Sequence, residues 1–214
     1  KTAYEIRNCD WSSDVCSSDL AVSESAGHWA KLIGDLRRRG LVAPAVLVTD
    51  GHAGLRKAVE AWPEVPIQRC TQHKQENLLQ AAPVHARREV RRDYRRIIDA
   101  RDGLAARKAY EAFIAKWSTL CPAVVRSLEE AGLELLTFYE FPKSMWKSLR
   151  TTNALENLNR EFRRRTKTQG SFATEAAGVT LLWGLVAFGQ IRLRRIDGYR
   201  DIHKLLRDQQ QEAA

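Results

Sequence analysis

The stretch APAVLVTDG, residues 43–51, decides the fold class of this chain. Val46, Leu47 and Val48 are consecutive, which is typical of a strand buried on both faces of a sheet that helices cover. Asp50 follows this strand and precedes Gly51, a position where open α/β sheets expose functional groups at a crevice. An Asp here is equally typical of a cap for the next helix. The stretch predicts an α/β fold and leaves both roles open for Asp50.

Helix and strand patterns alternate around this strand. SESAGHWAKLIGDLRRRG, residues 23–40, predicts a helix with possible caps at Ser23 and Ser25, an apolar stripe at Trp29, Leu32, Ile33 and Leu36, and an end at Gly40. HAGLRKAVEAWP, residues 52–63, predicts a short helix stopped by its proline, and VPIQRC, residues 65–70, predicts a second strand. This alternation is typical of α/β proteins.

From Thr71 to Leu149 the pattern is helical, and we expect no strand there. Two segments, residues 84–100 and 104–120, direct apolar residues inward: Val84, Val90, Tyr94, Ile97, Ile98, Ala109, Phe113 and Trp117. Their basic outer face fits DNA phosphates and a merely solvated surface equally well. A long apolar segment, residues 174–194, predicts the most buried helix of the protein.

The charge balance favours an anionic partner such as nucleic acid. The chain has 214 residues, 44% of them hydrophobic, and 35 Lys and Arg against 26 Asp and Glu, for a net charge of +9. A cationic but otherwise ordinary soluble surface is the alternative. No run is long and apolar enough to span a bilayer, so we expect a soluble protein without a membrane partner.

Residues 1–20, KTAYEIRNCDWSSDVCSSDL, resemble the translation of the two constant parts of an indexed sequencing-library adapter. We therefore exclude them from fold reasoning as an artefact, the alternative being a genuine Ser- and Asp-rich loop. Without them 33 basic and 22 acidic residues remain, a net charge of +11. Only Cys70 and Cys121 remain of the cysteines, so no disulfide framework is predicted and a reducing cytoplasm is expected.

The segment TTNALENLNREFRRR, residues 151–165, is strongly basic but contains Glu156. Read as a helix, it has an apolar stripe of Ala154, Leu155, Leu158 and Phe162. Another face holds Asn153, Glu156, Asn157, Arg160 and Arg164. Glu156 then either pairs with Arg160 four residues on, or converges with Asp50 on a divalent ion if the helices between them fold out as a unit. In the second case the arginines hold the phosphates on which the metal acts.

Cys70 and His73 form a lone C-x-x-H motif. A second Cys/His pair at zinc-finger spacing is missing from the sequence, so the motif does not establish a zinc site. A buried Cys with a hydrogen-bonded His is the local interpretation. A Cys–His nucleophile pair lacks an orienting third residue nearby.

Taken together and in order, SESAGHWAKLIGDLRRRGL, VLVTDG, PIQRCTQHKQENLL and LRTTNALENLNREFRRRTKTQGSF resemble the bacterial Mutator-type insertion-sequence transposases, over roughly residues 22 to 196. The resemblance implies a truncated RNase H-like core interrupted by an all-helical insertion. It implies a partial core at 21–82, the insertion at 83–149, and carboxy-terminal helices of the core at 150–214. Asp50 corresponds to the second Asp of an Asp-Asp-Glu triad, Glu156 to its Glu, and Cys70 with His73 to the family's C-x-x-H pair.

The resemblance also implies a function. Such enzymes use two Mg²⁺ or Mn²⁺ ions to cleave DNA at element ends and join the 3′-hydroxyl to target DNA, as homo-oligomers in the bacterial cytoplasm at the nucleoid. His73 would position DNA or a water, with Cys70 packed beside it. The DNA-binding residues expected are Arg150, Asn153, Arg160, Arg163, Arg164, Arg165 and Lys167.

The family's first Asp lies upstream of residue 22, where this chain has the adapter-like segment, so we expect this fragment to be inactive. The alternatives are a non-catalytic DNA-binding and dimerising fragment, and a helical regulator that binds DNA through arginines alone.

Overall fold

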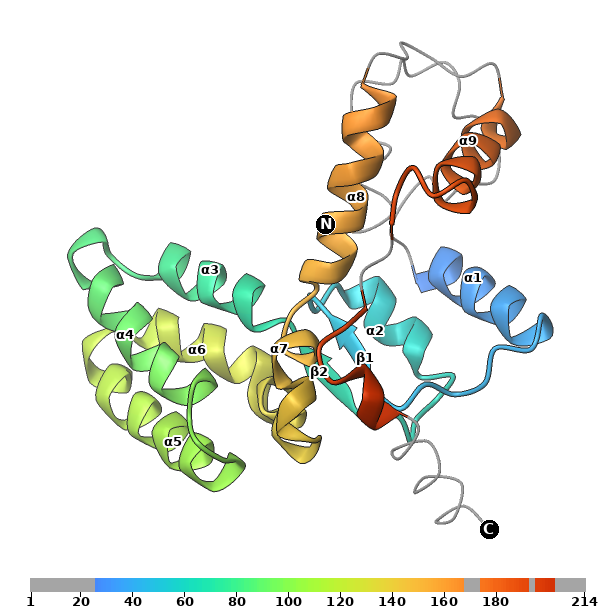
Figure 1. Ribbon diagram of the computed structural model, residues 1–214. Coiled ribbons are helices and arrows are strands. Elements are labelled where there is room, and N and C mark those ends of the chain that lie inside the picture. Colours follow the sequence, from blue (N-terminus) through green and yellow to red (C-terminus); the bar gives the residue numbers. More distant parts are fainter. Residues whose placement is uncertain (1–25, 168–173, 193–194, 203–214) are drawn as a thin grey trace. The chain divides into compact units, whose positions relative to one another are not determined.

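The computed structural model describes residues 26–167, 174–192 and 195–202 (Figure 1). The proposed artefact and the possible caps Ser23 and Ser25 lie outside the described residues. The described elements fall into two compact units. The first, here called the strand unit, contains both strands and the helices between residues 71 and 149. The second, the α8 unit, contains four helices from three separate parts of the chain.

The strand unit is built on two short parallel strands, β1 (Leu47–Thr49) and β2 (Ile67–Arg69). Their register pairs Leu47 with Ile67 and Thr49 with Arg69. Both strands were predicted, and with the surrounding helices they confirm a mixed α/β protein. The expected burial is partly wrong, because Leu47 and Val48 are only half-buried whereas Thr49 is 2% exposed.

Four helices form the body of this unit: α3 (Thr71–Ala81), α4 (Arg87–Ile98), α5 (Gly103–Leu120) and α6 (Pro122–Ala131). They lie side by side, α3 against α4 and α6, and α5 against α4 and α6 (Figure 1). Among the residues predicted to face inward, those that prove fully buried are Val90, Tyr94, Ile97, Phe113 and Trp117. Ile98 and Ala109 pack partly buried against this core.

Val84 was also predicted to face inward, and this is wrong, because it is 78% exposed. It lies in a 3₁₀ turn, Val84–Ala86, that precedes α4, so the helical spacing does not extend to it. The prediction of helices without a strand between residues 71 and 149 is confirmed.

The body is joined to β2 by short helical turns, Gly132–Leu135, Thr137–Glu140 and Lys143–Met145, which lead into α7 (Trp146–Leu149). Gln68 of β2 is fully buried and donates to the carbonyl of Leu135 at 3.2 Å, while its side-chain oxygen accepts from the N–H of Phe138 at 2.7 Å. A buried amide satisfied in this way fixes the strand against the turns. A further 3₁₀ turn, Tyr199–Asp201, belongs to the same unit.

The α8 unit contains α1 (Ala26–Arg38), α2 (Ala53–Val59), α8 (Asn153–Thr166) and α9 (Glu175–Ala187). α1 ends at Arg38, two residues before the predicted end at Gly40, and the φ of +96° at Gly40 suits glycine in the turn that follows. The N–H of Leu41 donates to Leu36 O and that of Gly40 to Arg37 O, which together satisfy the last carbonyls of the helix.

The prediction that residues 174–194 form the most buried helix is wrong. α9 ends at Ala187, and none of its described large apolar side chains is fully buried. Val179 is 52% and Trp183 65% exposed, with Phe188 just beyond at 80%, and the leucines of the helix are half-buried. An apolar composition shows that a helix can be buried, but the neighbouring elements decide whether it is. None of the helices that the structure describes is long and apolar enough to cross a membrane.

The predicted domain boundaries at residues 82 and 149 stay a prediction, and the two compact units divide the chain in another way. The strands share a unit with the helices of residues 83–149, whereas α1 and α2, expected beside the strands, belong with α8 and α9.

Candidate functional site

Asp50 lies directly after β1, in a turn that the backbone holds firmly. Its Oδ1 accepts a hydrogen bond from the N–H of His52 at 3.0 Å, and the N–H of Gly51 donates to Thr49 Oγ1 at 3.0 Å. The first bond forms an Asx turn ahead of α2. Asp50 is therefore half-buried and oriented by its own backbone.

Arg69, the last residue of β2, lies across this turn. Its side chain is 3% exposed, and its Nη1 and Nη2 donate to the two carboxylate oxygens of Glu130 at 2.9 and 3.1 Å. Nη2 also lies 3.4 Å from the carbonyl oxygen of Asp50. Gly51 has a φ of +94°, and a Cβ at this position would lie 1.9 Å from Arg69 Nη2. Only glycine fits between the turn and the guanidinium.

Glu130 binds a second buried cation. Lys74 Nζ, on a side chain 3% exposed, donates to Glu130 Oε2 at 2.6 Å and to the carbonyl of Ser127 at 2.8 Å. The hydrogen bonds from Arg69 and Lys74 lower the pKa of Glu130 to about 2. We call these three residues the Arg69–Glu130–Lys74 network. The sequence analysis missed it, and the only local signal was a glycine immediately after Asp50.

Cys70 and His73 are brought together at the start of α3. Cys70 is 1% exposed, and Thr152 Oγ1 lies 3.4 Å from its sulfur. Burial alone would raise the pKa of the Cys70 thiol, but hydrogen bonds with His73 and Thr152 outweigh it and lower the pKa to about 7. The described residues contain no group of three His, Cys, Asp or Glu side chains able to hold a metal ion.

Glu156 lies on α8, which begins and ends close to its predicted limits, but only part of the predicted apolar stripe is covered. Of that stripe, Ala154 and Leu155 are exposed, whereas Leu158 and Phe162 are half-buried. The most buried side chains are Asn159 and Thr166, both 4% exposed, and Glu156 is half-buried on the same face. Spacing identifies the faces of a helix, but it does not show which face other residues cover.

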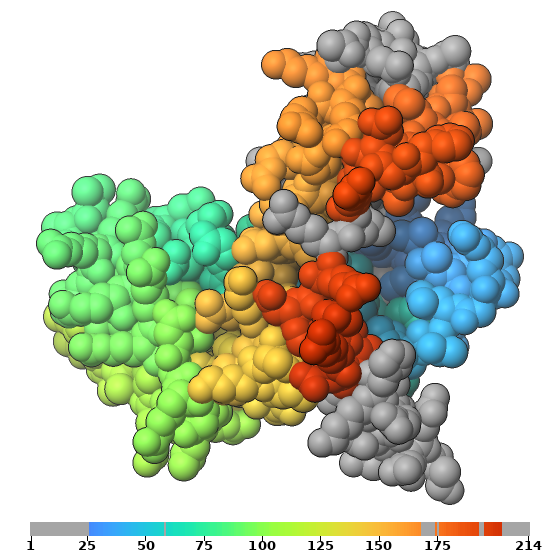
Figure 2. Space-filling model, viewed as in Figure 1, coloured from blue at the N-terminus to red at the C-terminus, as the bar shows by residue number. Residues whose placement is uncertain are grey.

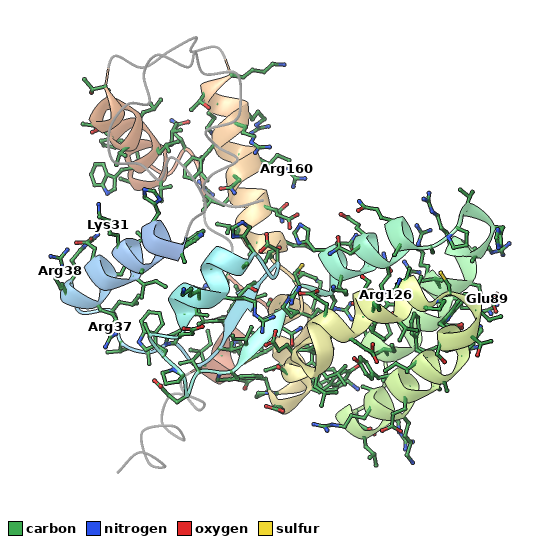
Figure 3. The ribbon with its side chains drawn as sticks, turned by 180° about the vertical axis from the view of Figure 1, so that it is seen from behind. Lys31, Arg37, Arg38, Glu89, Arg126 and Arg160 are labelled. Atoms are coloured by element: carbon green, nitrogen blue, oxygen red, sulfur yellow. The ribbon has the colours of Figure 1, made fainter. Side chains whose placement is uncertain are left out.

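The predicted DNA-binding residues of α8 differ in their surroundings. Arg160 extends away from the helix (Figure 3), and Asn153, Arg164 and Lys167 are also exposed. Arg164 and Arg165 share Glu161, and Arg165 in particular lowers the pKa of that carboxyl. Arg163 is partly buried. The exposed basic side chains leave α8 with a cationic outer face.

Arg150 lies apart from these residues, in the strand unit. It donates to Asp99 at 2.9 Å and to the carbonyl of Ile98 at 3.2 Å, so its charge is already balanced within the fold. Asp50 is in the strand unit and Glu156 in the α8 unit. Their convergence on one metal ion stays a prediction.

Comparison with known proteins identifies the class as transposases. A family model described as "Transposase, Mutator family" matches residues 5–189. The chain therefore belongs to the Mutator family of transposases, as the motifs predicted. The match begins at residue 5, inside the segment that resembles an adapter, and the origin of that segment stays a hypothesis.

Several curated relatives carry transposase names. The chain is 36% identical over 175 residues to "Transposase for insertion sequence element IS6120" of Mycolicibacterium smegmatis, covering 81% of this chain and 54% of the relative. It is 34% identical over 164 residues to the transposase for IS905 of Lactococcus lactis, covering 76% and 42%. It is 37% identical over 145 residues to the transposase for IST2 of Acidithiobacillus ferrooxidans, covering 67% and 49%. The chain thus spans about half the length of these relatives.

Proposed function

We propose that this chain is the carboxy-terminal part of a DNA transposase whose intact form cleaves DNA at the ends of an insertion sequence and joins the 3′-hydroxyl to target DNA. Membership of the Mutator family carries the proposal. The end of β1 supports it, because an Asp held by an Asx turn after a strand suits a catalytic carboxylate. We also propose that β1, β2 and the helices around them derive from an RNase H-like core with a helical insertion.

Asp50 and Glu156 are the residues proposed to hold Mg²⁺ or Mn²⁺. Their carboxylate oxygens are the ligands that these ions prefer, and the His52 N–H fixes one oxygen of Asp50, which leaves the other available for a ligand role. Bound ions would activate the attacking hydroxyl and stabilise the leaving oxygen. Within the chain, Arg160 and Arg164 would bind phosphate oxygens, and Arg69 would hold the turn that carries Asp50.

The second candidate is a non-catalytic fragment that binds DNA and dimerises. It rests on the motif correspondence given by the resemblance, in which Asp50 and Glu156 are the two members of the triad that have counterparts in this chain.

The decisive experiment measures nicking of a DNA duplex carrying an element end, with Mg²⁺ or Mn²⁺, by a full-length protein whose native segment before residue 22 has been restored. Glu156→Gln and Asp50→Asn should each abolish nicking and leave DNA affinity in EDTA unchanged. Glu129→Gln, an exposed acid on α6, is the matched control and should nick like the parent. Nicking by Glu156→Gln at the parental rate would refute the triad assignment.

The same assay on the 214-residue chain separates the two candidates. We expect the chain to bind DNA without nicking it. Metal-dependent nicking by this chain that Glu156→Gln abolishes would exclude the non-catalytic fragment.

A further inference from the structure

One face of α4 carries a dense set of exposed arginines. Its opposite face, with Val90, Tyr94 and Ile97, is fully buried in the core of the strand unit. Figure 2 shows the green atoms of α4 at the surface of the helical body. The exposed arginines of the helix are Arg87, Arg88, Arg91, Arg92, Arg95 and Arg96.

The acids of α4 are already bound elsewhere. Lys116 of α5 donates to Glu89, labelled in Figure 3, at 2.6 Å and also to Asp93. Trp117 Nε1 donates to Asp93 at 3.3 Å, and the side chain of Asp93 is 6% exposed. These contacts turn both carboxylates toward α5, where they join the two helices.

The arginines of α4 divide into two groups, those with a partner in the fold and those without one. Arg87 Nε donates to the carbonyl of Ala82 at 3.3 Å. Arg92 contacts Glu89 at 3.1 Å, and Arg96 contacts Asp93 at 3.4 Å. By contrast, Arg88, Arg91 and Arg95 make no side-chain hydrogen bond or ion pair with another described residue. We call these three the α4 arginine row.

The three charges of the α4 arginine row repel one another and lower the stability of the helix. The residues of the row have spacings of three and four, so their side chains are neighbours on one face. Like charges at such spacings destabilise a helix by about 0.2–0.5 kcal/mol per pair. The side chains are exposed, so the apolar surface that they bury offsets little of this cost. An external anion is the partner that would balance them.

We propose that the α4 arginine row binds the phosphate backbone of duplex DNA, at a site separate from α8. Seven residues of helix extend about 10 Å, and duplex DNA carries one negative charge per about 1.7 Å of axis, so one row faces several phosphates. Guanidinium groups suit phosphate oxygens and read no sequence when they contact only the backbone. The choice of DNA as the polyanion rests on the proposed function, whereas the binding site rests on the geometry of α4 alone.

The test measures binding of the 214-residue chain to a random-sequence duplex by fluorescence anisotropy, in EDTA, over a series of salt concentrations. The triple variant Arg88→Gln, Arg91→Gln, Arg95→Gln removes the row. If all three side chains neutralise phosphates, the slope of log affinity against log salt should fall by about 2 to 3.

A matched control removes the same charge from arginines that already have partners: Arg92→Gln, Arg96→Gln, Arg101→Gln, the last paired with Asp102. It should change the slope by less than about 1. Equal slopes for the two triple variants would overturn the proposal, because net charge alone would then explain binding. Unchanged DNA affinity with lost binding to phosphatidylserine vesicles would also overturn it.

This result is independent of catalysis. A row variant with reduced DNA affinity, together with a Glu156→Gln protein that still nicks, would uphold the DNA site and refute the triad. A row variant with parental DNA affinity, together with a Glu156→Gln protein that no longer nicks, would refute the DNA site and support the triad. Circular dichroism of each variant should match the parent, because every substituted side chain is exposed. In urea unfolding the row variant should be at least as stable as the parent, because the like charges are gone.

Discussion

Replacing Glu130 with Gln removes the carboxylate that contacts both Arg69 and Lys74. The side chains of both cations are 3% exposed, so the variant leaves two buried charges beside a neutral amide, with Glu134 as a more distant carboxylate 4.0 Å from Arg69 Nη1. Removing one partner of a buried ion pair costs about 3–5 kcal/mol. The side chain of Glu130 is 51% exposed, so water screens its side of the network and reduces this cost. We expect the free energy of unfolding of the strand unit to fall by about 2 kcal/mol.

The measurement is urea unfolding followed by pulsed hydrogen exchange in peptides from α3 and α6, so that the signal comes from the strand unit. With an m-value of about 2 kcal/mol per molar urea, the midpoint should fall by about 1 M. Glu129→Gln, one residue earlier and exposed, should change stability by less than about 0.5 kcal/mol. Equal midpoints for the two variants would show that the network does not stabilise the fold.

The effect of Glu130→Gln also depends on pH. Folding lowers the pKa of Glu130 from 4.5 to about 2, so its stabilising effect is fully present above about pH 4.5 and is lost as the pH falls toward 2. The difference in stability between the parent and the variant should therefore shrink between these two values. A difference that stays constant down to about pH 2 would contradict an electrostatic origin.

Three further substitutions test other features. Gly51→Ala should lower the free energy of unfolding, measured in urea, by at least about 2 kcal/mol, because φ is +94° and the new Cβ would overlap the guanidinium group of Arg69. The control Gly34→Ala, which has open space around it, should be neutral or stabilising. Thr152→Val should raise the pKa of the Cys70 thiol above about 7, because the hydroxyl of Thr152 is lost. The measurement is the pH dependence of thiolate absorbance in a protein whose other cysteines are replaced by Ser. An unchanged midpoint would show that the hydroxyl does not stabilise the thiolate. Trp183→Ser should cost less than about 1 kcal/mol in urea unfolding because the ring is 65% exposed, and a loss near 3 kcal/mol would mean that α9 is buried in solution.

The sequence predicted those elements whose structure is set by local pattern. The consecutive Val-Leu-Val run predicted β1 to within one residue, because such a run favours an extended chain in a covered sheet. The spacing of Val90, Tyr94 and Ile97 predicted the buried face of α4, because neighbouring helices cover that face on both sides. The family motifs predicted the class of protein, which the family match confirms.

The sequence did not predict which side of α8 and α9 is covered. On α8, Leu155 is exposed at 45% while Asn159 is 4% exposed, the opposite of what hydrophobicity alone favours. On α9, apolar residues surround the helix, so spacing gives no preferred face. In both helices burial depends on residues distant in the sequence.

The Arg69–Glu130–Lys74 network could not have been predicted for the same reason, and it bears on function. Arg69 and Lys74 have the charges of surface residues, and their shared partner lies 61 and 56 residues further along the chain. Because Arg69 also lies across the turn at Gly51, the network ties the position of Asp50 to α6. The helices after β2 are thus part of what fixes the proposed catalytic carboxylate. A substitution at Glu130 should then reduce nicking by the full-length enzyme more than it reduces DNA affinity, since it would displace a metal ligand without removing a phosphate contact.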